Sequence, residues 1–337
     1  MSIHIGSVQP RNPVFLAPMS GVTDEAFRTV AHAHGAGLVV SEMVASDALF
    51  QERPDMVRRA RGKSKISPFV IQLAGREAKW MAEGARLAQD LGADVIDINM
   101  GCPARQVTGG LSGSALMRDP DHAVSLIDAT VQASKVPVTV KMRLGWDHNT
   151  LNAPELARRA ELAGAQMITV HGRTRCMFYT GKADWPAIRA VKDAISIPLV
   201  ANGDGESAAD ARAMMAASGA DAVMFGRSTY GRPWWPGVVA DELQPGTGRA
   251  EPTPAEELDI MLWHQDETLR LYGHALGNKT FRKHLGWTLA RLELRGLMDG
   301  EAQAQARARL LSNKDNAQVA RGMCDVYARV LDNCEAA

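Results

Sequence analysis

The chain has 337 residues, of which 46% are hydrophobic and 23% charged, as in an ordinary globular protein. Its 38 basic and 38 acidic side chains balance, so total charge alone gives no sign of a nucleic-acid partner. No apolar run approaches the ~20 residues of a membrane span, and the N-terminus lacks the basic and apolar regions of a signal peptide. We therefore expect no membrane association.

Short apolar runs alternate with amphipathic stretches as far as about residue 240. Eight of these runs are candidate strands: Val14–Ala17, Leu38–Ser41, Phe69–Leu73, Val95–Asn99, Val138–Lys141, Met167–Val170, Leu199–Ala201 and Ala222–Phe225. Helical stretches such as Asp24–His34 and Ala208–Ser218 follow them, which indicates parallel βαβ units. Eight such units predict a (β/α)8 TIM barrel of the α/β class. A doubly wound sheet is the alternative, because local pattern does not show closure.

A Gly-Ala step precedes four of the expected strands, at Gly35, Gly92, Gly164 and Gly219. Glycine just past a helix end is typical of a C-cap. The repetition predicts one helix-to-strand turn that is used four times.

The composition changes after Leu243. Residues 244–254 contain Gly and Pro and read as a linker, so the barrel domain is expected to cover 1–243. Residues 255–337 have no strand-like run. Their helical stretches predict a small C-terminal helical-bundle domain: Glu256–Tyr272, Arg282–Leu294, Ala302–Leu311 and Ala317–Leu331.

Candidate site residues, most of them polar, gather where the expected strands end, which is where barrel enzymes carry their active sites. They are Pro18, Met19, Ser20, Gln72, Asn99, Cys102, Lys141, Arg143, His171, Arg173, Arg175, Asn202, Gly203, Asp204, Gly226 and Arg227. The loops after the last two strands form the usual phosphate site of barrels. Glycine lets backbone N–H groups approach a phosphate there, and Arg227 adds a charged donor.

Lys141 and Cys102 are the two side chains whose positions suggest a catalytic role. A lysine that closes a buried strand could form a Schiff base, as in an aldolase, or stand beside the N1/O2 edge of a flavin. Cys102 lies in a Gly-Cys-Pro turn, and an ordinary thiol is mostly protonated at neutral pH, which suits a general acid. The four cysteines form no CxxC pair and the nine histidines are scattered, so we expect no metal site and a reducing cytoplasm.

Several motifs resemble those of the tRNA-dihydrouridine synthase family, most closely its bacterial DusB branch. They are APMSGVTD (17–24), NMGCPA (99–104), VTGGLSGSALM (107–117), KMRLGW (141–146), HGRTR (171–175), YTGKADW (179–185), NGDG (202–205), FGRSTYGRPW (225–234) and FRKHLGW (281–287). They run through nearly the whole chain in order. Gly205 departs from the family, in which many members carry an apolar residue.

The resemblance implies FMN at the mouth of the barrel and NADPH as reductant. It puts Pro18, Met19, Ser20, Gln72, Lys141, His171, Asn202, Gly203, Asp204, Gly226 and Arg227 at the FMN, and Cys102 as the proton donor. Asn99, Arg143, Arg173 and Arg175 would then bind the substrate. It further implies hydride transfer to C6 of a tRNA uridine, and the likeness to the DusB branch suggests position 17 of the D-loop. We expect a cytoplasmic monomer.

A basic stretch offers a surface for tRNA. From Arg270 to Arg321 the sequence contains ten basic residues and only four acidic ones. We expect Arg282 and Lys283, which are among the ten, to bind the substrate. Three alternatives remain open: a dihydroorotate dehydrogenase-like FMN barrel that acts on a small substrate, a lysine-dependent aldolase, and a non-catalytic RNA-binding regulator.

Overall fold

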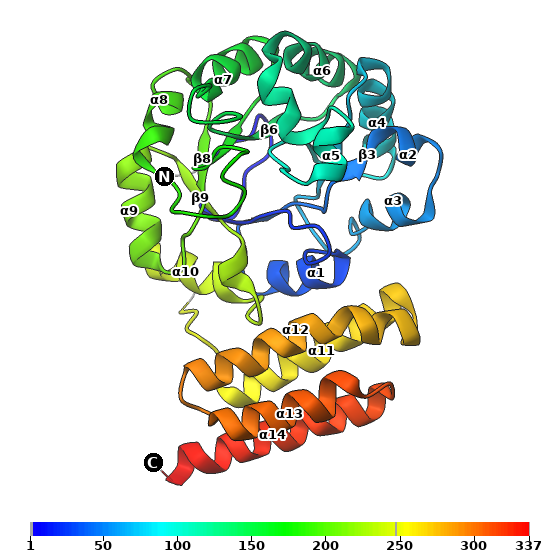
Figure 1. Cartoon of the computed structure of the whole chain (residues 1–337), viewed down its shortest axis with the longest axis vertical. Coiled ribbons are helices and arrows are strands. Elements are labelled where there is room, and N and C mark those ends of the chain that lie inside the picture. Colours follow the sequence, from blue (N-terminus) through cyan, green and yellow to red (C-terminus); the bar gives the residue numbers. More distant parts are fainter. Residues whose placement is uncertain (1–2, 247, 337) are drawn as a thin grey trace.

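The computed structural model describes residues 3–246 and 248–336, and it contains one parallel sheet that curls into a barrel (Figure 1). The strand order is β2-β1-β9-β8-β7-β6-β5-β4-β3. The strands are β1 (Val14–Leu16), β2 (Leu38–Val39), β3 (Val44–Ala45), β4 (Val70–Ala74), β5 (Val95–Met100), β6 (Val138–Arg143), β7 (Ile168–His171), β8 (Leu199–Asn202) and β9 (Ala222–Phe225). The two edge strands are consecutive in the chain, and a parallel bridge between Val40 and Val70 joins the end of β2 to β4. The predicted α/β barrel is therefore confirmed.

The second expected strand, Leu38–Ser41, is shorter in the structure, where β2 ends at Val39, and a further strand that was not expected, β3, follows at Val44–Ala45. The backbone turns at Ser41, whose hydroxyl accepts the Gln72 N–H at 2.9 Å and donates to the Glu42 carbonyl. This turn buries the Glu42 carboxylate, which accepts the N–H of Gly21 in the loop after β1. The sheet thus has nine strands where eight were expected.

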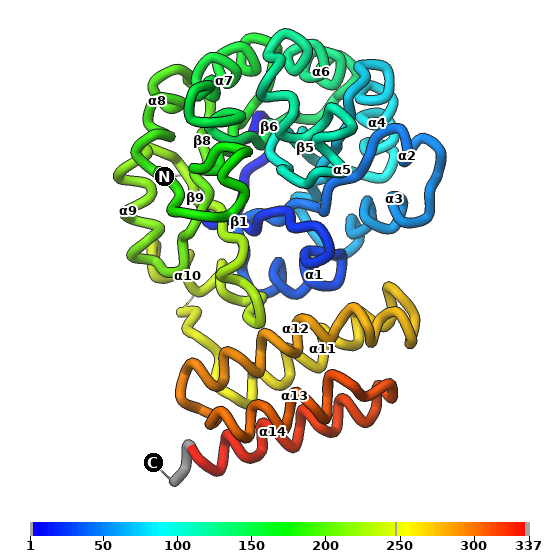
Figure 2. Tube along the Cα trace, in the orientation of Figure 1, coloured from blue at the N-terminus to red at the C-terminus, as the bar shows by residue number. Residues whose placement is uncertain are grey.

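Helices surround the sheet and cover its outer face (Figure 2). They are α1 (Glu25–Ala33), α2 (Ser46–Phe50), α3 (Pro54–Arg59), α4 (Ala78–Asp90), α5 (Arg105–Gly109), α6 (Pro120–Ala133), α7 (Ala153–Leu162), α8 (Arg189–Lys192), α9 (Ala208–Ser218) and α10 (Trp235–Leu243). Short 3-10 turns lie at Gly113–Arg118 (η1), Pro186–Ile188 (η2) and Arg227–Thr229 (η3). Helix α9 has the predicted bounds, and Ser207 and Asp210 form a capping box at its start.

The repeated Gly-Ala step is the predicted turn. Gly35, Gly92, Gly164 and Gly219 have φ values of +98°, +89°, +100° and +70°. Glycine adopts these values without the steric cost that a Cβ brings. Each turn sends the chain from a helix back into the sheet.

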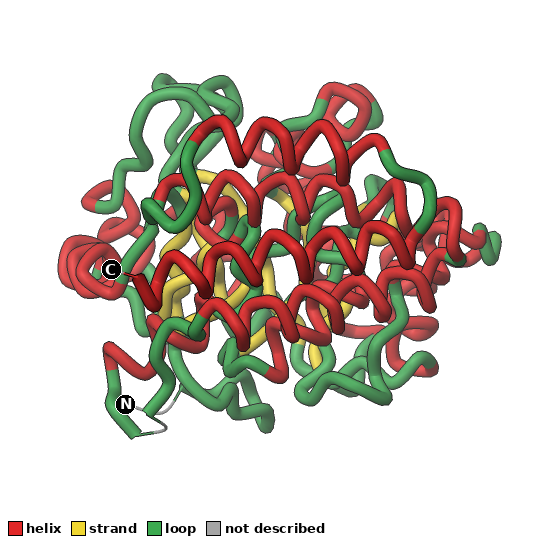
Figure 3. The backbone as a smooth tube through the Cα atoms, turned by 90° about the horizontal axis from the view of Figure 1, so that it is seen from below, coloured by secondary structure: helices red, strands yellow, loops and turns green. Residues whose placement is uncertain are grey.

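The four C-terminal helices form a separate layer beneath the barrel, where they lie side by side (Figure 3). They are α11 (Pro254–Tyr272), α12 (His274–Leu294), α13 (Gly300–Ser312) and α14 (Asn316–Ala336). Their facing sides bury a core of their own, which includes Met261, Phe281, Leu285, Leu310 and Tyr327. None of the helices that the structure describes is both long and apolar enough to cross a membrane.

The helical layer docks on the barrel through α1. Phe27 of α1 is fully buried, and its ring lies 5.5 Å from that of His264 and 5.3 Å from that of His284. The two imidazoles lie 4.6 Å apart, and no ring nitrogen of either has a hydrogen-bond partner within the described chain. Burial lowers the pKa of His264 to about 3 and that of His284 well below the usual range, so both rings are neutral and pack as aromatic groups.

Candidate functional site

A ladder of buried polar side chains crosses the floor of the barrel mouth. The Gln72 amide donates to Asp97 at 2.7 Å, and the Asn99 amide donates to the Gln72 carbonyl oxygen at 2.7 Å. Thr139 donates its hydroxyl to the other Asp97 oxygen at 2.6 Å. Burial raises the pKa of Asp97 to about 6, and the two hydrogen bonds and the nearby charge of Lys141 oppose that rise. Asp97 was not among the expected site residues, although a lone aspartate within the apolar strand Val95–Met100 was the available signal.

Lys141 of β6 is the register partner of Asn99 and lies beside this ladder. Its ammonium donates to the Asn202 side-chain oxygen at 3.0 Å, and the Asn202 amide donates to the Met224 carbonyl at 2.7 Å. Burial and the Arg143 charge lower the pKa of Lys141 to about 8, while Asp97 works in the opposite direction. The amine therefore changes charge close to physiological pH.

Cys102 occupies a turn that several hydrogen bonds hold in place. The Asn99 side-chain oxygen accepts the N–H groups of Gly101 at 3.2 Å and Cys102 at 3.0 Å. Ser114 donates its hydroxyl to the Cys102 carbonyl at 2.8 Å. The thiol is half-buried, and burial raises its pKa, so the protonated form is favoured. A fixed, protonated thiol is suited to donate a proton.

Two buried arginines organise the loops of the mouth. Arg143 donates to the carbonyls of Gly101, Thr174 and Phe178 at 2.8–2.9 Å. Arg173 is 1% exposed and donates to the carbonyls of Thr180 and Gly181 and to the Asp204 carboxylate. Both guanidinium groups therefore tie the loops after β5, β7 and β8 together.

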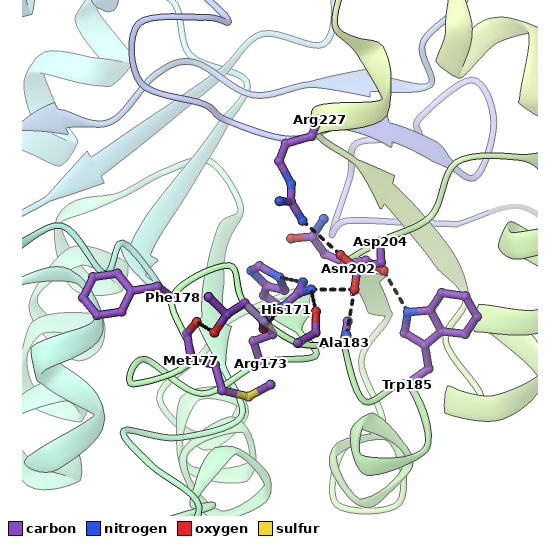
Figure 4. Close-up of polar contacts among 12 residues, drawn as sticks. His171, Arg173, Met177, Phe178, Ala183, Trp185, Asn202, Asp204 and Arg227 are labelled. Atoms are coloured by element: carbon purple, nitrogen blue, oxygen red, sulfur yellow. Dashed lines mark hydrogen bonds and ion pairs between the residues drawn. The ribbon is translucent and has the colours of Figure 1, made fainter. Parts of the chain in front are cut away.

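The loop after β8 meets the loop after β9 through Asp204 (Figure 4). This carboxylate accepts from Arg173 at 2.6 Å and from Arg227 at 3.0 Å, and these partners lower its pKa. The backbone bends sharply here, with φ of +126° at Gly203 and +56° at Asp204. Trp185 donates its indole N–H to the Gly203 carbonyl at 2.8 Å. His171 lies beside this loop, and burial and the neighbouring cations lower its pKa well below the usual range.

These two loops present the donors that a phosphate group requires. The Arg227 side chain is 51% exposed, so its guanidinium can take a further anion. The neighbouring Ser228 hydroxyl is buried and has no hydrogen-bond partner within the described chain. A Cβ on Gly203 would lie 2.7 Å from Ala183 Cβ and 3.0 Å from His171 Cδ2, so only glycine fits between them. The residues fit the phosphate end of a nucleotide cofactor.

The loop after β1 carries Pro18, Met19 and Ser20 to the same mouth. Met19 donates its N–H to the Thr23 hydroxyl at 2.8 Å. The Met19 sulfur approaches Gly226 so closely that it would lie 3.4 Å from a Cβ added there. The structure thus brings together the expected residues from all the principal strand ends. Their roles in binding stay predictions.

An aromatic and cationic rim, formed by Arg118, Trp146, Arg175 and Phe178, lies beside the mouth. The guanidinium carbons of Arg118 and Arg175 lie 4.3 Å and 4.7 Å from the centre of the Trp146 ring, and Arg175 also lies 4.5 Å from that of Phe178. Neither arginine forms an ion pair with a described carboxylate. The exposed Tyr179 lies nearby, 5.5 Å from Arg227. Trp146 and Tyr179 belong to the motifs KMRLGW and YTGKADW, but neither they nor Arg118 were among the expected site residues, because only the fold brings their loops together.

Arg282 and Lys283 lie on α12 in different environments. Arg282 donates to the Asn278 side chain and the Asn313 carbonyl at 3.2 Å. Lys283 is partly buried, which lowers its pKa, and interacts with the charges of Asp24 and Glu42 of the barrel. Lys283 therefore faces the barrel rather than standing free.

Within the described residues, no cluster of three or more His, Cys, Asp or Glu side chains is arranged to hold a metal.

A family model described as dihydrouridine synthase matches residues 15–321, which is most of the chain. The chain belongs to the dihydrouridine synthase family. The match extends from β1 into α14, so it includes both the barrel and the helical layer.

Relatives within this family are similar over nearly their full length. A probable tRNA-dihydrouridine synthase of Rhizobium leguminosarum is 54% identical, over 89% of this chain and 94% of that protein. One from Rickettsia prowazekii is 45% identical over 98% of this chain and 99% of its own. A tRNA-dihydrouridine synthase B of Pseudomonas putida is 42% identical over 91% and 94%.

Solved structures of low identity share the fold. Histamine dehydrogenase from Rhizobium sp. 4-9 aligns with a TM-score of 0.56 at 13% identity, over 84% of this chain and 50% of its own. Morphinone reductase aligns with a TM-score of 0.51 at 15% identity, over 76% and 93%. These likenesses show the fold alone.

Proposed function

We propose that this protein is a tRNA-dihydrouridine synthase that reduces the C5=C6 bond of a D-loop uridine, with FMN as cofactor and NADPH as reductant. The observation that carries the proposal is the arrangement at the mouth of the barrel. A thiol whose pKa is raised, a lysine with a pKa of about 8 and two loops joined by the Arg227–Asp204 ion pair lie at the mouth of the barrel in a chain of this family.

The residues that would hold FMN divide into two groups. Pro18, Met19, Ser20, Gln72, Lys141, His171 and Asn202 would surround the ring, and Gly203, Asp204, Gly226 and Arg227 the phosphate. When bound, FMN supplies the hydride that adds to C6 of the uracil. Lys141 in its protonated form would stabilise negative charge at the N1/O2 edge. Because Lys141 is held by Asn202, its ammonium is already oriented before any ligand arrives.

Cys102 would give its thiol proton to C5 of the uracil as the hydride reaches C6. The base gains one hydride and one proton, which together reduce the double bond, and the thiolate is reprotonated from solvent. The raised pKa of the Cys102 thiol keeps the proton in place until it is needed. Asn99 would orient both the turn and the base, since its side-chain oxygen already accepts two backbone N–H groups there.

The substrate would be tRNA, whose target base must leave its stack to reach a barrel mouth. We propose uridine 17, the position that the resemblance of the sequence motifs to the DusB branch implies. Arg143, Arg173 and Arg175 would lie near the base, and Arg282 and Lys283 belong to the domain that would bind the rest of the tRNA. In this scheme residues 1–243 form the catalytic domain, 244–254 the linker and 255–337 the tRNA-binding domain of a cytoplasmic monomer.

The test uses the full-length protein with unmodified tRNA, FMN and NADPH. We expect a yellow protein and dihydrouridine at position 17, measured by mass spectrometry of nuclease fragments. Cys102→Ala should keep its FMN and its tRNA affinity but lose turnover, whereas the control Cys176→Ala, on an exposed cysteine, should stay active. A protein that binds no FMN, or a fully active Cys102→Ala variant, would contradict the proposal.

A further inference from the structure

The loop after β9 is in direct contact with the helical layer. Tyr230, which directly follows η3, stacks on Trp287 of α12 with ring centres 3.9 Å apart and an interplanar angle of 13°. The same short turn carries Arg227 and Ser228, and Tyr230 donates its N–H to the Arg227 carbonyl at 3.1 Å. One aromatic pair therefore links the anion-binding turn to a helix from the other domain.

The contact continues from side chain to backbone at Gly231. This glycine has a φ of +71°, and a Cβ placed there would lie 2.7 Å from both the Trp287 carbonyl carbon and the Thr288 nitrogen. Thr288 also donates its hydroxyl to the Gly231 carbonyl at 3.3 Å. The loop therefore rests directly on the backbone of α12, and a side chain at position 231 would push the two apart.

Helix α12 is also anchored to the barrel on the same side. His284 lies one turn before Thr288, and its ring contacts Phe27 of α1 at 5.3 Å and Trp287 at 5.3 Å. Lys283 lies one turn before Trp287 and faces the charges of Asp24 and Glu42. Residues at this spacing share one helix face. That face is held against both the β1 loop, through Glu42 and Gly21, and the β9 loop.

We propose that α12 of the helical layer is part of the phosphate-binding apparatus, and that Trp287 and Tyr230 are positioning residues that hold the Arg227–Ser228 turn in the shape that receives a phosphate. This inference rests on the proposed FMN function. It adds that occupancy of the phosphate site and docking of the helical layer are coupled, and such coupling is reciprocal. A ligand that shifts α12 would change the affinity of the site for the phosphate group, and a bound phosphate group would in turn change the affinity for that ligand.

Riboflavin separates this role from general stability, because it carries the same ring as FMN and no phosphate. The dissociation constants of both flavins are measured by fluorescence on the full-length protein freed of flavin. In Trp287→Ala we expect FMN to bind about tenfold more weakly, from loss of the stacked pair, with riboflavin affinity changed less than twofold. Tyr230→Ala, which removes the other half of the pair, should give the same ratio, and Trp287→Phe should restore it.

Trp263→Ala is the matched control. Trp263 is an α11 residue that contacts the barrel at His34, 6.0 Å between ring centres, away from the β9 loop. It should leave the ratio of the two affinities unchanged. Equal weakening of FMN and riboflavin in Trp287→Ala and Tyr230→Ala, or no weakening of either, would overturn the inference while leaving the proposed function intact. A wild-type protein that binds neither flavin would overturn both.

Discussion

Asp97→Asn isolates the charge of the buried carboxylate that lies beneath the mouth. The asparagine side chain has the same shape, and its oxygen can still accept from Gln72. The Thr139 hydroxyl can turn to accept the new amide, since a hydroxyl is both donor and acceptor. The change therefore removes a negative charge near Lys141 and keeps the ladder of hydrogen bonds. Lys141 should then become neutral at a lower pH.

The size of the effect follows from the register of β5 and β6. Thr139 is the partner of Asp97, and Lys141 lies two residues further along the same face, a diagonal spacing of about 7 Å. At an effective dielectric constant of about 20, two unit charges at that distance interact by roughly 2 kcal/mol. This corresponds to between one and two pH units. The pKa of Lys141, about 8 in the wild type, should therefore fall to roughly 6–7 in the variant.

The assay is the pH dependence of tRNA reduction between pH 5.5 and 9. Activity that needs protonated Lys141 is lost as pH rises through its pKa, so the alkaline limb of Asp97→Asn should move down by one to two pH units. Below about pH 6 the profiles should converge, because Asp97 is itself protonated there in the wild type. Asp128→Asn, on the exposed side of α6, is the charge control. An unchanged alkaline limb in Asp97→Asn would refute the reasoning.

Three further predictions concern other parts of the molecule. Iodoacetamide should alkylate Cys102 more slowly than the exposed Cys176 at pH 8, because burial raises the pKa of the Cys102 thiol; equal rates by peptide mass spectrometry would argue against a protected proton donor. His264→Phe should lessen the loss of stability in acid. The pKa of His264 is about 3 in the folded protein and near 6.5 in the unfolded chain, so the stability that the neutral ring provides is lost as pH falls below about 6.5. In urea unfolding, the free energy of unfolding of the variant should therefore rise relative to wild type by about 1.4 kcal/mol per pH unit between pH 6 and 5. Arg118→Gln should lower the slope of log tRNA affinity against log salt concentration by about one, because one phosphate contact is lost. Arg158→Gln, on the exposed side of α7, should leave that slope unchanged. Equal slopes for the two variants would show that the rim is not part of the tRNA surface.

Local pattern was sufficient for the barrel and for the position of its mouth. Apolar runs of strand length, each followed by an amphipathic stretch, predicted the parallel sheet, and the repeated glycine at helix ends predicted turns that the positive φ values confirm. The strand ends of a parallel barrel meet at one edge. Lys141, Asn202 and Cys102 could therefore be assigned to one site before any contact between them was known.

Tertiary structure alone decided how the site is held together. The turn at Ser41 between β2 and β3, which directs Glu42 to Gly21, depends on a hydrogen bond to Gln72 that no local pattern contains. Arg173 was expected at the substrate, yet its guanidinium also secures Asp204, 31 residues away.

The neutral charge of the chain, its helical end and its barrel mouth could thus be inferred from sequence, because they depend on composition and on short-range periodicity. The pairing of Trp287 with Tyr230 could not, since it joins the barrel to the helical layer across 57 residues of chain. Such contacts depend on how the finished helices and loops pack, and that is settled only when the whole chain has folded.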